Sequence, residues 1–423
     1  MIWAGLAVVL LMALLGAPLF AVVLGAAMLG FLAVGVDLAA VGINIYDLTD
    51  KPLLAALPFF TFAGYLMAEA KSSERLMALT RALVGWMPAG LAIVGFVACA
   101  LFTALTGASG VTIVALGALL LPMLKASGYS ERYSLGLVTS SGSLGVLIVP
   151  SVPLILYGVV AQQMDVGERF TIQELFMGGL GPALVMVVFL SVWTILRHGD
   201  VPRSSFNAGE VWQAVKAARW ELPLPFVVLG GIYSGYFVIS EAAAMTAIYV
   251  LIAEVGLYRE VSLRALPRVI RESMVMVGSI LLILGVALAF TNFLVDAQIP
   301  EALFEFMQRH VTSPWTFLLL LNILLLVLGA ILDIFAAIII MVPLLLPVAV
   351  GYGIHPVHLG IIFLANLQIG YFTPPIGMNL FIASYRFDRP VLELYAACLP
   401  FMMVLLAALI VITYVPWLST WFT

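Results

Sequence analysis

The segment GYSERYSLGLVTSSGSLGVLIVPSVPLILYG, residues 128–158, has a counterpart in GYGIHPVHLGIIFLANLQIGYFTPPIGMNLF, residues 351–381. A shift of 223 or 224 residues superposes Gly128-Tyr129 on Gly351-Tyr352, Leu135-Gly136 on Leu359-Gly360, and Pro150 on Pro374. Both segments are largely apolar, yet Gly and Pro interrupt each of them near its middle. The pair therefore predicts an internal repeat in which each half holds one discontinuous helix.

The composition around these segments excludes a soluble protein. Hydrophobic residues make up 64% of the 423 residues and charged residues only 9%, whereas soluble domains carry about 25% charged residues. We therefore expect an all-α integral membrane protein. A net charge of −4 gives no reason to expect a nucleic-acid partner. Cys99 and Cys398 lie in apolar segments, so we expect packing roles for both.

Gly, Pro and charged clusters divide the chain into membrane-spanning segments, because a helix needs about 20 apolar residues to cross the hydrocarbon. Two apolar stretches, 85–124 and 315–350, have double length and a central break. They are either re-entrant hairpins or pairs of full spans. The remaining crossings are predicted at 2–16, 18–36, 52–70, 133–162, 176–196, 222–239, 241–257, 272–293, 356–384 and 391–416.

The distribution of charged residues predicts the orientation. With the N-terminus outside, all Lys and Arg residues except Lys51, Arg169 and Arg309 fall on the cytoplasmic side. This asymmetry is what the positive-inside rule requires. Both termini are therefore expected outside, and the two halves then have opposite topologies.

The chain thus divides into two inverted-topology repeats, a design that places solute and ion sites near the membrane midplane. Residues 1–200 form the first repeat, with hairpin 85–124 and broken helix 133–162. Residues 201–221 form a cytoplasmic connector. Residues 222–423 form the second repeat, with hairpin 315–350 and broken helix 356–384. No G-x-x-x-x-G-K-[ST] motif is present, so transport would use an ion gradient or be passive.

Candidate site residues lie at the four breaks, because unwound backbone exposes carbonyls that suit a cation, and half-helix N-termini attract an anion. In the first half, the hairpin tip is expected to face the broken helix. The second half is expected to repeat this arrangement. The candidates are Thr106, Gly107, Ser109 and Gly110 with Ser140, Ser141 and Gly142, and Gly329 and Asp333 with Asn366, Gln368, Thr373 and Pro374.

Asp333 is the strongest single candidate for a functional residue, because it lies in an apolar run, residues 317–346, that contains no basic residue. A carboxylate buried there requires a bound cation or a proton. The alternative is that Asp333 marks a helix end at the membrane surface. For the uncharged polar candidates, the alternative is hydrogen bonding between helices.

Five segments, read together, resemble a known family over essentially the whole chain: LLAALPFFTFAGYLM from Leu53, GASGVTIVALGALLLPMLKASGYS from Gly107, SSGSLGVLIVPSVPLILYG from Ser140, GGIYSGYFVISEAAA from Gly230 and NLQIGYFTPPIGMNLF from Asn366. The chain resembles the large M subunit of tripartite ATP-independent periplasmic (TRAP) transporters. In the first broken helix it departs from the family, which commonly shows Gly-Pro and Pro-Pro where this chain has Gly145-Val146 and Val149-Pro150.

The resemblance implies a sodium-coupled elevator-type importer of carboxylates or related organic acids in the bacterial inner membrane, and not an enzyme. It implies two partners, a small four-helix Q subunit and a periplasmic solute-binding P subunit, and no cofactor besides sodium ions. By the same resemblance, sodium sites involve Ser109, Ser140, Ser141, Asp333, Asn366 and Thr373. The alternatives are a stand-alone anion carrier or exchanger and, less favoured by the motifs present, an intramembrane enzyme.

Overall fold

The computed structural model describes residues 2–47, 51–201 and 205–422, and these are helical with connecting turns. Among them, eight helices are long and apolar enough to cross a membrane, or nine if the bent pair within residues 131–163 is one span. The protein is therefore an all-helical, multi-pass membrane protein, as its composition predicts.

The described residues of the first half include ten α-helices and the two short 3₁₀ turns η2 (Pro52–Ala55) and η3 (Leu144–Leu147). The α-helices are α1 (Ile2–Leu14), α2 (Leu19–Val34), α3 (Ala39–Tyr46), α4 (Ala56–Glu69), α5 (Ser72–Val84), α6 (Gly90–Thr106), α7 (Ser109–Ala126), α8 (Glu131–Ser141), α9 (Val152–Gln163) and α10 (Ile172–His198).

The second half begins after the connector, which holds a short helix of its own, α11 (Ala208–Ala217). A π-helical turn, η4 (Ile252–Leu257), extends α13. The helices are α12 (Pro223–Tyr233), α13 (Ile239–Leu251), α14 (Leu266–Asp296), α15 (Ile299–His310), α16 (Pro314–Ile331), α17 (Ile334–Gly351), α18 (Pro356–Gly370), α19 (Met378–Phe387), α20 (Val391–Tyr414) and α21 (Trp417–Thr420).

Each double-length stretch folds as two helices joined by a two-residue tip. The first tip is Gly107-Ala108, where Gly107 adopts φ +68° and so ends α6 in the left-handed region that glycine favours. The second tip is Leu332-Asp333. It lies later in the chain than the start of the predicted break, because Asp333 caps α17 and leaves Gly329 inside α16.

Both predicted broken helices are interrupted. In the first, residues 142–151 separate α8 from α9, and the two halves meet at 43°. In the second, residues 371–377 separate α18 from α19. The element order helix pair, then broken helix, then long helix thus occurs once in each half of the chain.

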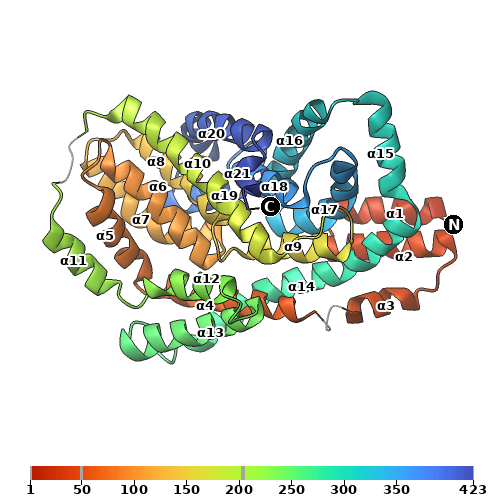
Figure 1. Ribbon diagram of the computed structural model, residues 1–423, viewed down its shortest axis with the longest axis horizontal. Helices are drawn as coiled ribbons and strands as arrows, with labels where there is room; N and C mark the ends of the chain where they lie inside the picture. The colour runs from red at the N-terminus through yellow and green to blue at the C-terminus, as the bar shows by residue number, and fades with distance from the viewer. Residues whose placement is uncertain (1, 48–50, 202–204, 423) are drawn as a thin grey trace.

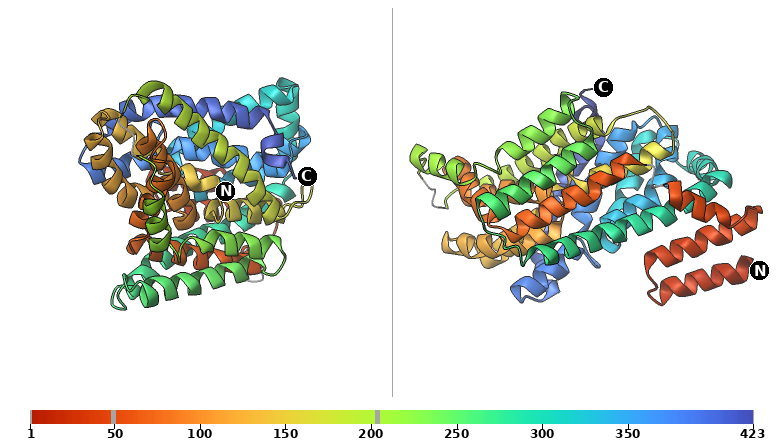
Figure 2. Two further views of the ribbon diagram at one scale, coloured as in Figure 1. Left: turned by 60° about the vertical axis from the view of Figure 1, so that its left-hand side comes forward. Right: turned by 90° about the horizontal axis from the view of Figure 1, so that it is seen from below.

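The helices form two groups (Figures 1 and 2). Helix α4 packs against both α13 and α14 to form a layer, and the helix pairs and broken helices lie beside it. The α1–α2 pair stands at one end, where α2 packs on α14 with Phe31 edge-on to Phe293 at 6.3 Å. This division separates an outer layer from the part of the molecule that holds the chain breaks.

One buried ion cluster joins α5 to this layer. The Arg75 guanidinium contacts Glu221 and lies 3.0 Å from the Glu254 carboxylate and 2.7 Å from that of Glu260. It also stacks 3.8 Å from the centroid of the Tyr258 ring. Because α5 leads directly into the first helix pair, the Arg75 cluster holds the entry to that pair in place.

We expect Arg75→Met to lower the stability of the protein severely. The substitution leaves three carboxylates of the cluster without their cation, and breaking a buried ion pair typically costs about 3–5 kcal/mol. The matched control is Lys125→Met, which removes an exposed pair with Glu131 at 2.9 Å, and exposed pairs contribute little. The apparent melting temperature of the purified chain in detergent measures both effects. Equal melting temperatures for the two variants would show that the Arg75 cluster adds no stability.

Candidate functional site

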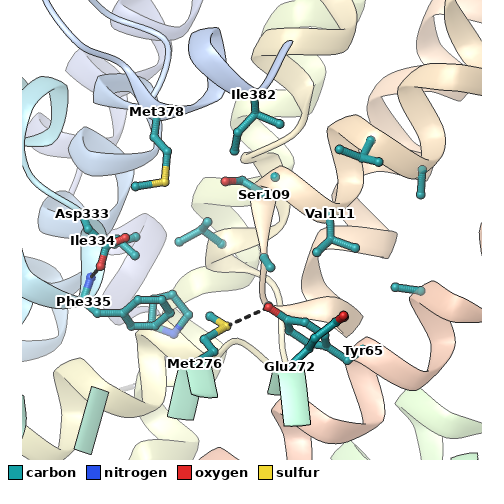
Figure 3. Close-up of a pocket in the computed structure, with 18 of the residues that line it drawn as sticks. Tyr65, Ser109, Val111, Glu272, Met276, Asp333, Ile334, Phe335, Met378 and Ile382 are labelled. Atoms are coloured by element: carbon teal, nitrogen blue, oxygen red, sulfur yellow. Dashed lines mark hydrogen bonds between the residues drawn. The ribbon is translucent and has the colours of Figure 1, made fainter. Parts of the chain in front are cut away.

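The two tips and the two chain breaks meet around one cavity of about 590 Å³ (Figure 3). This volume is typical of a pocket for a small molecule. Four helices contribute their first turns to the wall, and α4 and α14 close the opposite side. The lining residues include Tyr65, Glu69, Gly107, Ala108, Ser109, Gly110, Val111, Val146, Pro153, Glu272, Met276, Asp333, Ile334, Phe335, Tyr371, Met378 and Ile382.

The first tip brings three predicted residues, Gly107, Ser109 and Gly110, to the cavity wall. Helix α7 begins at Ser109 without a side-chain cap, so its first backbone N–H groups face the cavity region unpaired by any side chain. The tip also approaches α19 closely, since a Cβ at Gly110 would lie 2.6 Å from Ile382 Cδ1. Thr106 turns away and donates to the Phe102 carbonyl at 2.9 Å.

The second tip places Asp333 at the cavity, where it also ends a helix. Its carboxylate accepts hydrogen bonds from the Phe335 N–H at 3.1 Å and from the Tyr371 hydroxyl at 3.0 Å. The Tyr371 oxygen in turn accepts from the Ile334 N–H at 2.9 Å. Asp333 thus joins the second tip to the second chain break. It marks a helix end, as part of the alternative interpretation required, but this end lies at the cavity.

The first broken helix lies directly behind the first tip. Ser140 and Ser141 are fully buried and both donate to the Leu137 carbonyl, at 3.3 and 2.7 Å. The Gly142 carbonyl accepts from the Thr103 hydroxyl at 2.8 Å. A Cβ at Gly142 would lie 3.3 Å from the Ser109 carbonyl oxygen. The first tip therefore approaches this helix at Gly142, inside the protein, whereas Ser140 and Ser141 hydrogen-bond within their own helix and do not line the cavity.

In the second broken helix, the predicted residues Asn366 and Gln368 are buried deep in the protein. The Asn366 amide donates to Asn322 of α16 at 2.6 Å, and the Thr373 hydroxyl donates to the Ile369 carbonyl at 2.9 Å. Pro374 is exposed, and none of Asn366, Gln368, Thr373 or Pro374 lines the cavity. Within the described part of the chain, the side-chain oxygens of Asn366 and Gln368 are buried without a hydrogen-bond partner. A cation is one ligand that satisfies such oxygens.

Gly329 does not line the cavity but packs against helix α18. A Cβ at Gly329 would lie 3.0 Å from the Leu367 Cα, because α16 crosses α18 there with almost no space between the backbones. This close approach is typical of small residues at helix crossings in membranes.

Several cavity residues were missed by the sequence analysis. Tyr65 and Glu69 come from α4, and Glu272 and Met276 come from α14. The Tyr65 hydroxyl lies 3.5 Å from the Met276 sulfur, and Figure 3 shows Tyr65 and Glu272 across the cavity from Asp333. These residues sit in uninterrupted helices, so no break in the sequence indicated them. Glu272 could have been noticed in the sequence, because it is a charged residue at the start of the predicted span 272–293.

A multi-pass helical protein whose broken helices and helix tips enclose a small-molecule cavity belongs to the class of membrane transporters. The family model for the tripartite ATP-independent periplasmic transporter, DctM component, matches residues 4–418. The chain therefore belongs to this family, as the resemblance of its sequence implies, and it is a transporter permease rather than an enzyme.

Known proteins support this assignment. The C4-dicarboxylate TRAP transporter large permease protein DctM of Rhodobacter capsulatus is 36% identical over 91% of this chain and 90% of that protein. The isethionate TRAP transporter permease protein DctMQ of Oleidesulfovibrio alaskensis is 35% identical over 88% of this chain and 58% of that protein. The crystal structure of the Alcanivorax borkumensis YdaH transporter has a similar fold, with TM-score 0.60 and 14% identity over 87% of this chain and 85% of that one.

Proposed function

We propose that this permease imports a small organic acid by sodium-coupled, elevator-type transport. The observation that carries the proposal is the convergence of both helix tips and both chain breaks on one cavity that holds Asp333. The proposal names a class of solute, because the relatives named above are described for different solutes, C4-dicarboxylates and isethionate.

Sodium is the proposed coupling ion. Asp333 has hydrogen-bond donors but no basic partner within the described ranges, so a cation would complete its surroundings. Ser109 approaches the first broken helix at Gly142, two residues after Ser140. In the second half, Asp333 lies in the second tip and Thr373 in the second chain break. We propose one sodium ion near each of these two pairs, held by hydroxyl, carboxylate and backbone oxygens.

The proposed moving part comprises the helix pairs and the broken helices, and the proposed fixed part is the layer of α4, α13 and α14. Each of these two parts takes helices from both of the inverted repeats proposed for residues 1–200 and 222–423, which the connector 201–221 joins. With both termini on the periplasmic face, Glu69 and Glu272 lie at cytoplasmic helix ends. Because both residues line the cavity, we propose that the structure represents an inward-open state.

Two partner subunits complete the proposed system. The family name describes a tripartite transporter of which DctM is one component, so the complete system contains further components. The DctMQ relative is much longer than this chain, and its name pairs M with Q in one polypeptide. We propose that this chain works with a separate small Q subunit in the inner membrane and with a periplasmic solute-binding protein.

Uptake is expected to require a sodium gradient and no ATP. Proteoliposomes that contain this chain and its small subunit, supplied with the loaded binding protein, should accumulate labelled solute when sodium is high outside. The control replaces sodium by potassium on both sides at equal ionic strength. Undiminished accumulation in potassium would refute sodium coupling.

A further inference from the structure

The cavity has two chemically different walls. One wall consists of the first turns of α7, α9, α17 and α19, represented by Ser109, Pro153, Ile334 and Met378. Three of these helices, α7, α9 and α19, begin without a side-chain cap. Helix N-termini present free N–H groups and partial positive charge, so this wall suits an acid group.

The opposite wall presents a carboxylate among aromatic and thioether groups. Glu272 of α14 lies there with Tyr65 and Met276, and Figure 3 shows Phe335 between this group and Asp333. A carboxylate beside aromatic rings is the combination that recognises an alkylammonium group, through charge and cation–π attraction. This wall therefore suits a cation.

The carboxylates of Glu69, Asp333 and Glu272, which line the cavity, differ in the partners that balance their negative charge. Glu69 contacts Arg268, and Asp333 accepts two hydrogen bonds from the protein. Glu272 makes no ion pair with another residue of the described ranges, although it lines the cavity and is exposed. No Lys, Arg or His side chain is among the described lining residues. A solute with two negative ends would therefore meet acidic groups without a balancing side chain.

We infer that the solute is a zwitterion, with an acid group at the helix N-termini and a compact cationic group at Glu272, which is the specificity-determining residue. This inference rests on the proposed function, because it assigns a chemical class to the solute of the same cavity. It narrows the proposed organic acid to one whose net charge is near zero.

The test compares three four-carbon probes that differ only at one end: 4-aminobutanoate, a zwitterion; succinate, a dianion; and butanoate, a monoanion. Binding to the full-length chain in lipid nanodiscs is measured by calorimetry in sodium buffer. We expect 4-aminobutanoate to bind at least about tenfold more tightly than succinate. In Glu272→Gln this preference should fall about tenfold, because the carboxylate that holds the ammonium is gone.

The matched control is Glu74→Gln, the same change at an exposed glutamate of α5 that does not line the cavity. It should leave the preference unchanged. The inference is overturned if succinate binds as tightly as 4-aminobutanoate, if the zwitterion does not bind at millimolar concentration, or if Glu272→Gln leaves the preference unaltered.

Repeating the titrations in potassium separates this inference from the proposed function. Zwitterion-selective binding that is equal in sodium and potassium would keep the inference and refute sodium coupling. Sodium-dependent binding that favours succinate would keep the coupling and overturn the inference.

Discussion

Asp333→Asn is expected to weaken sodium binding at least about tenfold, a loss of about 1.4 kcal/mol, while the protein still folds. Asparagine keeps the shape of the side chain and one of its two oxygens, so it can still accept from the Phe335 N–H. Its NH2 group replaces the oxygen that accepts from the Tyr371 hydroxyl and can donate to the Tyr371 oxygen instead. The cap of α17 is therefore retained. What disappears is the negative charge that we propose to balance a sodium ion at the second tip.

The measurement is the sodium concentration that gives half of the sodium-dependent rise in melting temperature of the purified chain, which needs neither the solute nor the partner subunits. The matched control is Asp37→Asn, because the Asp37 carboxylate also accepts from a backbone N–H two residues later, that of Ala39 at 2.8 Å. Asp37 is exposed and far along the chain from either tip. An unchanged sodium dependence in Asp333→Asn would leave Asp333 with a capping role alone.

Much of the fold could be predicted because lipid imposes simple rules on sequence. Apolar length placed the helices, and Gly and Pro placed their interruptions, so the first tip at Gly107 and both broken helices are where the sequence indicated. The second tip was harder. In the sequence, Gly329 and Asp333 were both candidates for the break between the two helices. The structure shows that Asp333 caps α17 at the tip, whereas Gly329 lies inside α16 where this helix crosses α18 closely.

The cavity could be predicted only in part, because one side of its wall comes from α4 and α14, which show no interruption. Tyr65 and Glu272 are more than 200 residues apart, and only the packing of α4 against α14 brings them together. The ion cluster of Arg75 is a similar case, since its glutamates, Glu221, Glu254 and Glu260, come from the end of the connector and from the segments after it. Residue spacing carries no information about such contacts. A break in a helix, by contrast, is a local property of the sequence.

The short 3₁₀ turn η3 packs against α6 through Gly145, at a point that leaves no space for a side chain. A Cβ at Gly145 would overlap the Ala100 carbonyl oxygen and lie 2.5 Å from the Ala104 nitrogen, both in the backbone of α6. The second half repeats the arrangement, since a Cβ at Gly370 would lie 2.5 Å from the Gly329 carbonyl carbon in α16. In both halves, the broken helix touches the first helix of the pair through a glycine.

Gly145→Ala is expected to prevent this contact and to cost more than the roughly 1–3 kcal/mol typical of overpacking, because the obstructing atoms belong to a helix backbone that cannot rotate away. Since α6 leads into the first tip, the tip would be displaced and transport lost. The matched control is Gly278→Ala in α14, where an added Cβ has no neighbour within 4 Å, so the variant should keep or slightly raise stability. Monodisperse yield, apparent melting temperature and uptake compare the two variants. Wild-type behaviour of Gly145→Ala in all three would show that η3 tolerates a side chain and does not need its close contact with α6.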